Sequence, residues 1–302
     1  MPKADKGYFK RASPSINHET CTGCGLCTTV CGGEPLVLRE KQVEIDPNAS
    51  LGCLGCGQCM AICPTGSITI NGRNLSPGDM FDLTQESPKA TPQQLEALLR
   101  PRRSIRHFRE EEVARELVDR ILDISATAPM GIPPSQVGIV VFHGRDKVKA
   151  FSDDVMVSLK KALRVLTPST LALFRPFISK ADYEGLKEFV LPLGSAFERE
   201  KDRGGDPILY GAPVALLFHR TPYAEPADPA IAATYAMLAA ESMGLGTCMI
   251  GLVGAFMERD KKLMSKYGIP KGNRLGLVLL IGHPAVRFKR GVRRRFDSVR
   301  FA

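Results

Sequence analysis

Two short stretches near the start of the chain alternate apolar and polar residues. In residues 35–45 both arms of the alternation predict a β-hairpin, and residues 67–70 repeat the first arm. Residues 1–18 are polar without a clear period, and we expect them to form an irregular arm. The pattern predicts a small domain built on short strands.

From residue 91 onward, helical and strand patterns alternate. Thr91, Pro92 and Gln94 form the signature of a helix start with a capping box. Buried strands and further helices follow; we expect strands at 137–142, 212–218 and 275–281, and helices at 110–127, over most of 146–205, and at 230–243. The last of these helices is apolar on nearly every side, so other elements or a second subunit must cover it. This order predicts an α+β fold.

Proline, glycine and serine are frequent between the two patterns. We therefore expect a first domain at 1–75, a linker at 76–90 and a second domain at 91–302. A length of 302 residues suffices for one small and one larger domain.

Eight of the nine cysteines form two runs with the same spacing. The runs are related by an offset of 32 residues, and in order their cysteines are Cys21, Cys24, Cys27 and Cys31, then Cys53, Cys56, Cys59 and Cys63. Glycines recur between them at the same offset, at Gly23 and Gly55 and at Gly25 and Gly57. This is an internal repeat built on metal-ligand spacing, and its glycines suit left-handed backbone close to a ligand.

The spacing is that of two-cluster bacterial ferredoxins, in which the fourth cysteine of each run binds the other cluster. We therefore assign one [4Fe-4S] cluster to Cys21, Cys24, Cys27 and Cys63, and a second to Cys53, Cys56, Cys59 and Cys31. The first run ends in Cys31-Gly32 where the pattern has Cys-Pro, which leaves the eight ligands in place. A disulfide framework and structural zinc are the alternatives. A chain of this length needs no disulfides, and zinc sites use pairs of cysteines.

The net charge of +9 needs correction for these clusters. Two oxidised cubanes lower it to about +5, and a phosphate-bearing flavin would subtract roughly two more. The remaining excess does not indicate a nucleic-acid partner. No apolar run is long enough for a membrane span, and the N-terminus lacks a signal-peptide core. Eight thiolates committed to clusters imply a reducing cytoplasm.

Four later segments carry a family resemblance. They are 102–108 (RRSIRHF) with Ala128-Pro129 after one helix, 211–214 (GAPV), 243–251 (MGLGTCMIG) and 280–284 (LIGHP). In this order they resemble the nitroreductase family of FMN flavoproteins, and with the cysteine runs they resemble the ferredoxin-fused members. The resemblance implies an FMN-binding second domain and a homodimer with FMN at the subunit interface.

Arginines beside a serine offer charged forks and a hydroxyl to a phosphate and to the flavin's pyrimidine edge. The resemblance implies that FMN is held by the following residues: Arg102, Arg103, Ser104 and Arg106; Pro129, Met130 and Gly131 toward the partner's flavin; Met249, Ile250 and Gly251 along the ring; and Arg293 and Arg294 near the phosphate. Gly251 is the expected N–H donor to flavin N5. Pro133 stands where the family often has Asn. The alternative for 102–108 is a solvated basic segment, and Cys248 is expected to be a packing residue.

These features predict an oxidoreductase without a catalytic protein residue. Electrons would pass from a low-potential donor, a ferredoxin-like protein or NAD(P)H, through two [4Fe-4S] clusters to FMN. They would leave to a small organic acceptor such as a nitroaromatic, a quinone or an enone. Three alternatives remain: an electron-transfer subunit without its own substrate, a redox sensor that binds nucleic acid, and direct reduction of the flavin by NAD(P)H.

Overall fold

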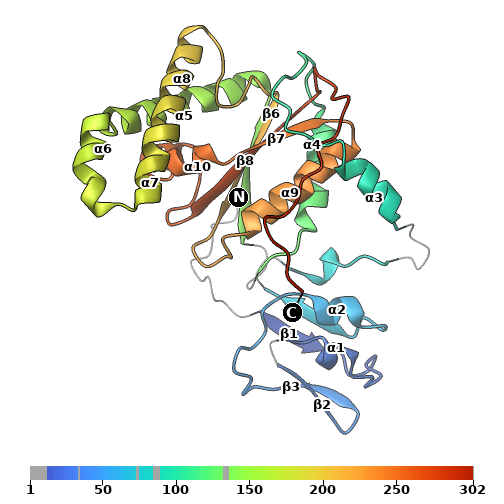
Figure 1. The fold of residues 1–302 in the computed structure, drawn as a ribbon. Coiled ribbons are helices and arrows are strands. Elements are labelled where there is room, and N and C mark those ends of the chain that lie inside the picture. Colours follow the sequence, from blue (N-terminus) through green and yellow to red (C-terminus); the bar gives the residue numbers. More distant parts are fainter. Residues whose placement is uncertain (1–11, 33–34, 73–74, 84–88, 132–135, 302) are drawn as a thin grey trace. The chain divides into compact units, whose positions relative to one another are not determined.

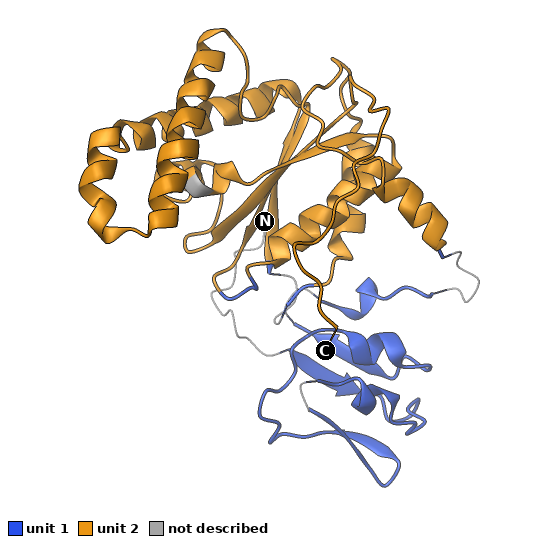
Figure 2. Ribbon diagram, in the orientation of Figure 1, with its two compact units in different colours: residues 1–89, 130–136, 223–225 blue, residues 90–129, 137–222, 226–302 orange. Residues whose placement is uncertain are grey.

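The computed structural model describes residues 12–32, 35–72, 75–83, 89–131 and 136–301. The chain divides into two compact units (Figures 1 and 2). Unit 1 contains 1–89, 130–136 and 223–225, and unit 2 contains the remaining residues. The division after Lys89 falls within the expected linker, whereas the two short later segments of unit 1 have no signal in the sequence.

The described residues of unit 1 form two antiparallel strand pairs and two short helices. β1 (Ser13–Ile16) pairs with β4 (Ile68–Asn71), and β2 (Leu36–Arg39) pairs with β3 (Gln42–Ile45). The helices are α1 (Leu26–Thr29) and α2 (Gln58–Ile62), and a 3-10 turn, η1, spans Pro77–Asp79.

The expected hairpin is confirmed as β2 and β3. Its two turn residues, Glu40 and Lys41, both have positive φ, as a type I′ turn requires. The expectation of an irregular arm over 1–18 is wrong for Ser13–Ile16, which forms β1. The partner strand lies more than fifty residues further along the chain, so no local pattern in 13–16 could reveal the pairing.

Unit 2 is built on one antiparallel sheet in the order β5-β6-β8-β7. The strands are β5 (Val137–His143), β6 (Val214–Arg220), β7 (Gly246–Ile250) and β8 (Arg274–Gly282). The helices are α3 (Pro92–Leu99), α4 (Arg115–Ala126), α5 (Arg145–Val165), α6 (Pro168–Phe174), α7 (Lys180–Gly185), α8 (Leu191–Asp202), α9 (Asp228–Ser242), α10 (Leu252–Met257) and α11 (Lys261–Lys266), with the 3-10 turn η2 (Arg175–Phe177) and the π-helical turn η3 (Leu186–Val190).

Both faces of this sheet are buried. Along β6, Ala215 and Leu217 pack into a core with α5 and α10, whereas Leu216 and Phe218 pack into a second core with α4 and α9. The side chains of a strand point alternately to opposite faces, so each central strand feeds both cores. The sheet therefore lies between two helical layers (Figure 1), and the α+β prediction is confirmed.

The capping box at the start of α3 is confirmed. The backbone N–H of Thr91 donates to Gln94 Oε1 at 2.8 Å, and the N–H of Gln94 donates to Thr91 Oγ1 at 3.2 Å. The predicted strands are found as β5, β6 and β8, and the predicted apolar helix as α9. That helix packs against α4, β6 and β8. Among the described residues, no helix combines the length and the apolar character that a membrane crossing needs.

The helix expected over 110–127 begins only at Arg115. Tertiary contacts hold the preceding residues out of the helix. The carbonyl of Val113 lies 2.7 Å from His143 Nε2, and Glu112 lies 3.5 Å from the guanidinium of Arg145. The helical pattern of the sequence could not predict these contacts, because His143 and Arg145 lie about thirty residues further along the chain.

Burial of His219 on β6 favours its neutral form in the folded chain. Burial lowers its pKa from the usual 6.5, and its Nδ1 lies 2.9 Å from the amide nitrogen of Asn273, which donates to it. Below about pH 6.5 the unfolded chain therefore binds more protons at this residue than the folded chain does. We expect the free energy of unfolding to fall as the pH drops below that value, and less steeply in His219→Gln. Urea unfolding at pH 5.5 and 7.5 measures the difference, with exposed His107→Gln as the control; equal pH dependence in His219→Gln and the wild type would contradict it.

Candidate functional site

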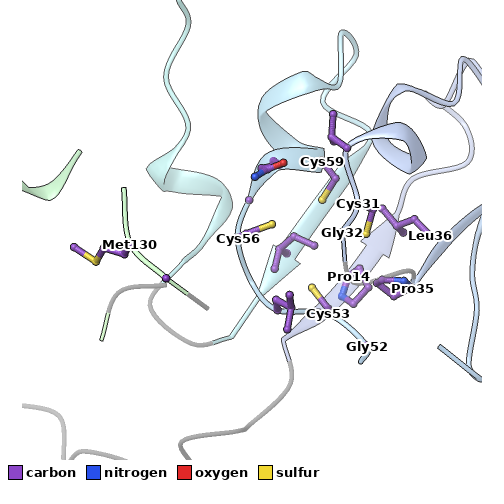
Figure 3. Close-up of a pocket in the computed structure, with 16 residues that line it drawn as sticks. Pro14, Cys31, Gly32, Pro35, Leu36, Gly52, Cys53, Cys56, Cys59 and Met130 are labelled. Atoms are coloured by element: carbon purple, nitrogen blue, oxygen red, sulfur yellow. The ribbon is translucent and has the colours of Figure 1, made fainter. Parts of the chain in front are cut away.

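The eight clustered cysteines of unit 1 surround two cavities. One cavity is lined by Cys21, Cys24, Cys27 and Cys63. The other has a volume of about 240 Å³ and is lined by Cys31, Cys53, Cys56 and Cys59 (Figure 3). The structure thus brings the last cysteine of each run to the cavity of the other run. These groups of four are the ones that the sequence spacing assigns to two clusters, and the ligand role itself stays a prediction.

Two glycines set the start of the short helices that carry buried cysteines. Gly25 precedes α1 with φ +73°, and Gly57 precedes α2 with φ +77°. Residues with a Cβ rarely adopt this conformation, so the repeat needs glycine here. Each turn places a cysteine, Cys27 or Cys59, in the first turn of its helix with the thiol buried.

Burial and mutual repulsion disfavour the thiolate at the centre of the second cavity. Burial raises the pKa of Cys59 to about 12, and the neighbouring sulfurs of Cys53, Cys31 and Cys56 add to the effect. Cys27 in the first cavity likewise has a raised pKa, chiefly through burial. Without bound metal these thiols hold their protons at neutral pH, so a cluster must displace protons to bind.

Cys63 differs from these two cysteines. Burial acts to raise its pKa, but hydrogen bonds from Thr65 and from the N–H of Ser67 outweigh burial and lower it. Thr65 Oγ1 lies 3.6 Å from Cys63 Sγ, and Ser67 N lies 3.3 Å from the same sulfur. Donors that face this sulfur favour its anionic form.

The cysteine groups fit a cubane better than a single ion. Over the part of the chain that the structure describes, no three His, Cys, Asp or Glu side chains are arranged to hold one metal ion. In a cubane each thiolate binds a different iron, so the four sulfurs surround a volume and do not converge on a point. Four cysteines around a cavity have this arrangement.

The loop that begins at Pro129, which we expect to face a partner's flavin, is divided between the two units. Pro129 is exposed in unit 2, whereas Met130 and Gly131 belong to unit 1 and line the second cysteine cavity (Figure 3). Pro133 lies outside the described residues. A flavin contact by this loop stays a prediction.

In unit 2 the arginine-rich segment forms an additional edge of the sheet. Ser104 pairs in parallel with Thr247 of β7, and the N–H of Ile105 donates to the carbonyl of Thr247 at 2.8 Å. Further along, the N–H of Arg109 donates to the carbonyl of His283 at 2.9 Å. The segment is therefore fixed at both ends against β7 and the end of β8.

The three arginines of this segment differ in their freedom to bind a ligand. The guanidinium of Arg103 donates to the carbonyls of Arg102 and Val292, at 2.6 and 3.3 Å, so it is already used within the chain. Among the described residues, no carboxylate lies within ion-pair distance of Arg102 or Arg106. Guanidinium groups without a close ion pair fit an anionic group such as a phosphate.

Arg106 lies against an unusual residue. Its guanidinium carbon is 5.8 Å from the centre of the Tyr210 ring, and Tyr210 has φ +55°, which is uncommon for a residue with a side chain. The carboxylate of Asp206 holds the turn by accepting from the N–H groups of Leu209 and Gly211 at 3.0 and 3.1 Å. The contact with the Tyr210 ring restricts the guanidinium of Arg106.

The remaining predicted flavin contacts lie at the end of β7 and in the tail. Met249 and Ile250 are partly buried, and Gly251 is exposed directly after the strand. A Cβ added to Gly251 would meet no atom within 4 Å, so the space beside its backbone is open. Arg293 and Arg294 are exposed and directly follow Val292, whose carbonyl is bound by Arg103. All these flavin contacts stay predictions.

Sequence reasoning missed the strand β7 and the polar pair beside it. The hydroxyl of Thr247 donates to Glu241 Oε1 at 3.1 Å. Burial raises the pKa of Glu241, while this hydrogen bond and the charge of Arg102 act in the opposite direction. Cys248 is buried as expected. The four consecutive residues Thr247 to Ile250 are typical of a buried strand and were the available signal.

Two family models match the chain. The model of the nitroreductase family matches residues 99–283, and that of a 4Fe-4S dicluster domain matches residues 13–64. The first match covers more than half of the chain. The chain belongs to the nitroreductase family. Its N-terminal part matches a ferredoxin-type module in addition.

Individual relatives agree with this assignment. An FMN reductase [NAD(P)H] of Bacillus subtilis (strain 168) is 29% identical over 195 residues, which are 61% of this chain and 64% of that protein. The match therefore spans less than two thirds of that relative's length. A nitroreductase with bound FMN from Bacteroides fragilis NCTC 9343 superimposes with a TM-score of 0.52 at 16% identity, over 69% of this chain and 99% of that chain. A nitroreductase from Desulfitobacterium hafniense DCB-2, also with bound FMN, superimposes with a TM-score of 0.50 at 20% identity. The superposition covers 68% of this chain and 96% of that chain. The two structures support the fold.

A substitution at Gly246, which lies against Ile105, tests whether the arginine segment packs on β7. A Cβ added to Gly246 would lie 2.7 Å from Ile105 Cγ1 and 3.0 Å from its Cβ. Gly246→Ala should therefore push the segment away from β7, cost about 1–3 kcal/mol of stability through overpacking, and lower the FMN content of the purified chain. Gel filtration with flavin absorbance measures the content. Gly185→Ala, which meets no atom within 4 Å, is the control. Full FMN content in Gly246→Ala would contradict this placement.

Proposed function

We propose that the chain is an iron–sulfur flavoprotein oxidoreductase. It passes electrons through two [4Fe-4S] clusters to FMN and on to a small organic acceptor of the nitroaromatic, quinone or enone class. The single observation that carries this proposal is the pair of cysteine-lined cavities in a chain of the nitroreductase family. The B. subtilis relative's name, FMN reductase, supports FMN as the organic cofactor.

The residues of the chain bind and orient both groups. Bound FMN supplies one- and two-electron chemistry, and the clusters supply one-electron chemistry. Arg102 and Arg106 hold the phosphate and the pyrimidine edge, because among the described residues neither guanidinium lies within ion-pair distance of a carboxylate. Ser104 adds a hydroxyl, and Gly251, where an added Cβ would meet no atom within 4 Å, offers its backbone N–H to the flavin. No side chain acts as a nucleophile or as a general base.

The partners follow from this chemistry. A low-potential donor, a ferredoxin-like protein or NAD(P)H, supplies electrons, and the acceptor stacks on the flavin. We further propose a cytoplasmic homodimer, in which a second copy completes the flavin site. The eight free thiols of unit 1 need reducing surroundings to remain available to iron.

The arginine pair tests the flavin site. Arg102→Ala combined with Arg106→Ala removes two charge-assisted contacts, each worth roughly 1.5–3 kcal/mol, so FMN should bind at least about a hundredfold more weakly. Flavin fluorescence titration of the stripped protein measures this affinity. The control is Arg164→Ala with Arg259→Ala, which removes the same charge from exposed positions of unit 2. Unchanged affinity in the first variant would place the cofactor elsewhere.

The cysteines test the clusters. The anaerobically purified chain should contain about eight irons, and Cys27→Ser or Cys59→Ser should each reduce this number to about four while FMN remains bound. Iron, sulfide and flavin analysis measures the three contents. Cys248→Ala is the matched control, because Cys248 lies in unit 2 and should leave the iron content unchanged. Full iron content in both serine variants would refute the ligand assignment.

The same variants test the route of the electrons. Under anaerobic rapid mixing with a reduced ferredoxin-type donor, the wild-type flavin should bleach, and Cys59→Ser should slow the bleaching at least tenfold. Equal rates in wild type and variant would exclude a route through this cluster. If NADPH bleaches the flavin before any cluster is reduced, electrons enter at the flavin and leave through the clusters. A wild-type chain that reduces no quinone or nitroaromatic once charged with electrons would instead be an electron-transfer subunit.

A further inference from the structure

The cysteines that line the two cavities of unit 1 fall in the same burial classes but differ in polar surroundings. At the offset of 32 residues, each cysteine has a counterpart in the same burial class: Cys21 and Cys53 are intermediate, Cys24 and Cys56 exposed, Cys27 and Cys59 buried, and Cys31 and Cys63 intermediate. Within the described residues, solvent exposure of the ligands therefore does not distinguish the two sites. A difference between them has to come from other groups near the sulfurs.

Such a difference occurs at the fourth cysteine of each run. Two donors face Cys63 Sγ, the backbone N–H of Ser67 at 3.3 Å and the hydroxyl of Thr65 at 3.6 Å. They lie four and two residues after the cysteine. The positions four and two residues after Cys31 hold Pro35 and Gly33. Proline has no backbone N–H and glycine has no hydroxyl, so neither donor can exist there, whatever the backbone conformation.

The hydroxyl beside Cys63 belongs to a chain of three. Ser67 Oγ lies 2.6 Å from Thr65 Oγ1 and 2.8 Å from Thr20 Oγ1, and Ser67 is buried. Each hydroxyl has one proton to donate. The hydroxyl of Thr20 can donate to Ser67 at 2.8 Å or to the carbonyl of Asn17 at 3.4 Å. If Ser67 donates to Thr65, the proton of Thr65 remains for the sulfur, and a negative sulfur favours this orientation.

The repeat shows that these polar positions are specific to one half. The residue that matches Thr20 is Gly52, Ser67 matches Pro35, and Thr22, which lines the first cavity, matches Leu54, which lines the second. Hydroxyl-bearing positions around the first site are thus glycine, proline or leucine around the second.

Donors to a cluster's sulfurs raise its reduction potential, since reduction adds negative charge that is shared with those sulfurs. We infer that the cluster held by Cys21, Cys24, Cys27 and Cys63 has the higher potential and is reduced first, and that Thr65, Ser67 and Thr20 are the positioning residues that set this order. The cluster of Cys31, Cys53, Cys56 and Cys59 is then the stronger reductant. This inference rests on the proposed function, because it requires both clusters to be present.

An anaerobic redox titration of the whole chain with bound clusters, followed by electron paramagnetic resonance, tests the order. The wild type should show two distinct midpoints. Thr65→Val keeps the shape of the side chain and removes the donor, so it should lower only the higher midpoint. A tenfold lower ratio of reduced to oxidised cluster corresponds to about 59 mV for a one-electron couple, and we expect a shift of that order at most. Ser67→Ala, which interrupts the hydroxyl chain but keeps the N–H, should give a smaller shift in the same direction.

The converse variant acts on the other cluster. Pro35→Ala supplies the missing backbone N–H and should raise only the lower midpoint. Ser15→Ala is the control, because Ser15 forms a hydroxyl contact with Thr69 at 2.6 Å on the same strand pair, without a cysteine partner, and both midpoints should remain in place.

The outcomes separate two failures. Eight irons with coinciding wild-type midpoints, or a Thr65→Val that moves the lower midpoint or neither, would overturn the proposed order. A wild-type chain that binds no iron would overturn the proposed function itself, and iron analysis of the same sample decides which applies. If Thr65→Val fails to fold, a Pro35→Ala that moves the higher midpoint or neither would still overturn the order.

Discussion

The crowding of four sulfurs around each cavity is the constraint on which unit 1 depends. Burial disfavours the thiolates of Cys27 and Cys59, and neighbouring sulfurs add repulsion. The apolar core beside them is small, with Val43, Met60 and Ile70 among its members. Iron that neutralises the thiolates would stabilise the fold that presents them. Cluster binding and folding would then be linked.

Unit 2 has no such dependence, because its central strands are covered by helices on both faces. This sheet is a rigid base for a site built at its β7 edge. There Ser104 and Ile105 pair with Thr247, and the segment carries Arg102 and Arg106 with it. Backbone hydrogen bonds define where the segment lies, which leaves the guanidinium groups free for a ligand. The same chain therefore combines a unit built around two cysteine-lined cavities with a unit whose sheet is buried on both faces.

In the repeat of unit 1, the residues that position the cysteines recur, whereas those that donate hydrogen bonds to a cysteine sulfur do not. The cysteines and the glycines before α1 and α2 recur in both halves, so both cavities have the same construction. The residues two and four positions after the last cysteine do not recur, as Thr65 and Ser67 against Gly33 and Pro35 show. The positions of the cysteines and the hydrogen bonds to their sulfurs can therefore change independently of each other. Two sites with the same arrangement of cysteines can thus differ in redox behaviour.

Local chemistry in the sequence determined the spacing within each cysteine run, the hairpin of β2 and β3, and the cap of α3, since each depends on residues close together in the chain. The exchange of the fourth cysteines between the two groups was predicted from the known pattern of two-cluster ferredoxins. Only the tertiary structure decided that Ser13–Ile16 is a strand, that α4 begins at Arg115, and that the arginine segment extends the β7 edge. Each of these rests on hydrogen bonds or ion pairs to residues far away in sequence. A local period carries no record of such partners, because they meet only after the chain has folded.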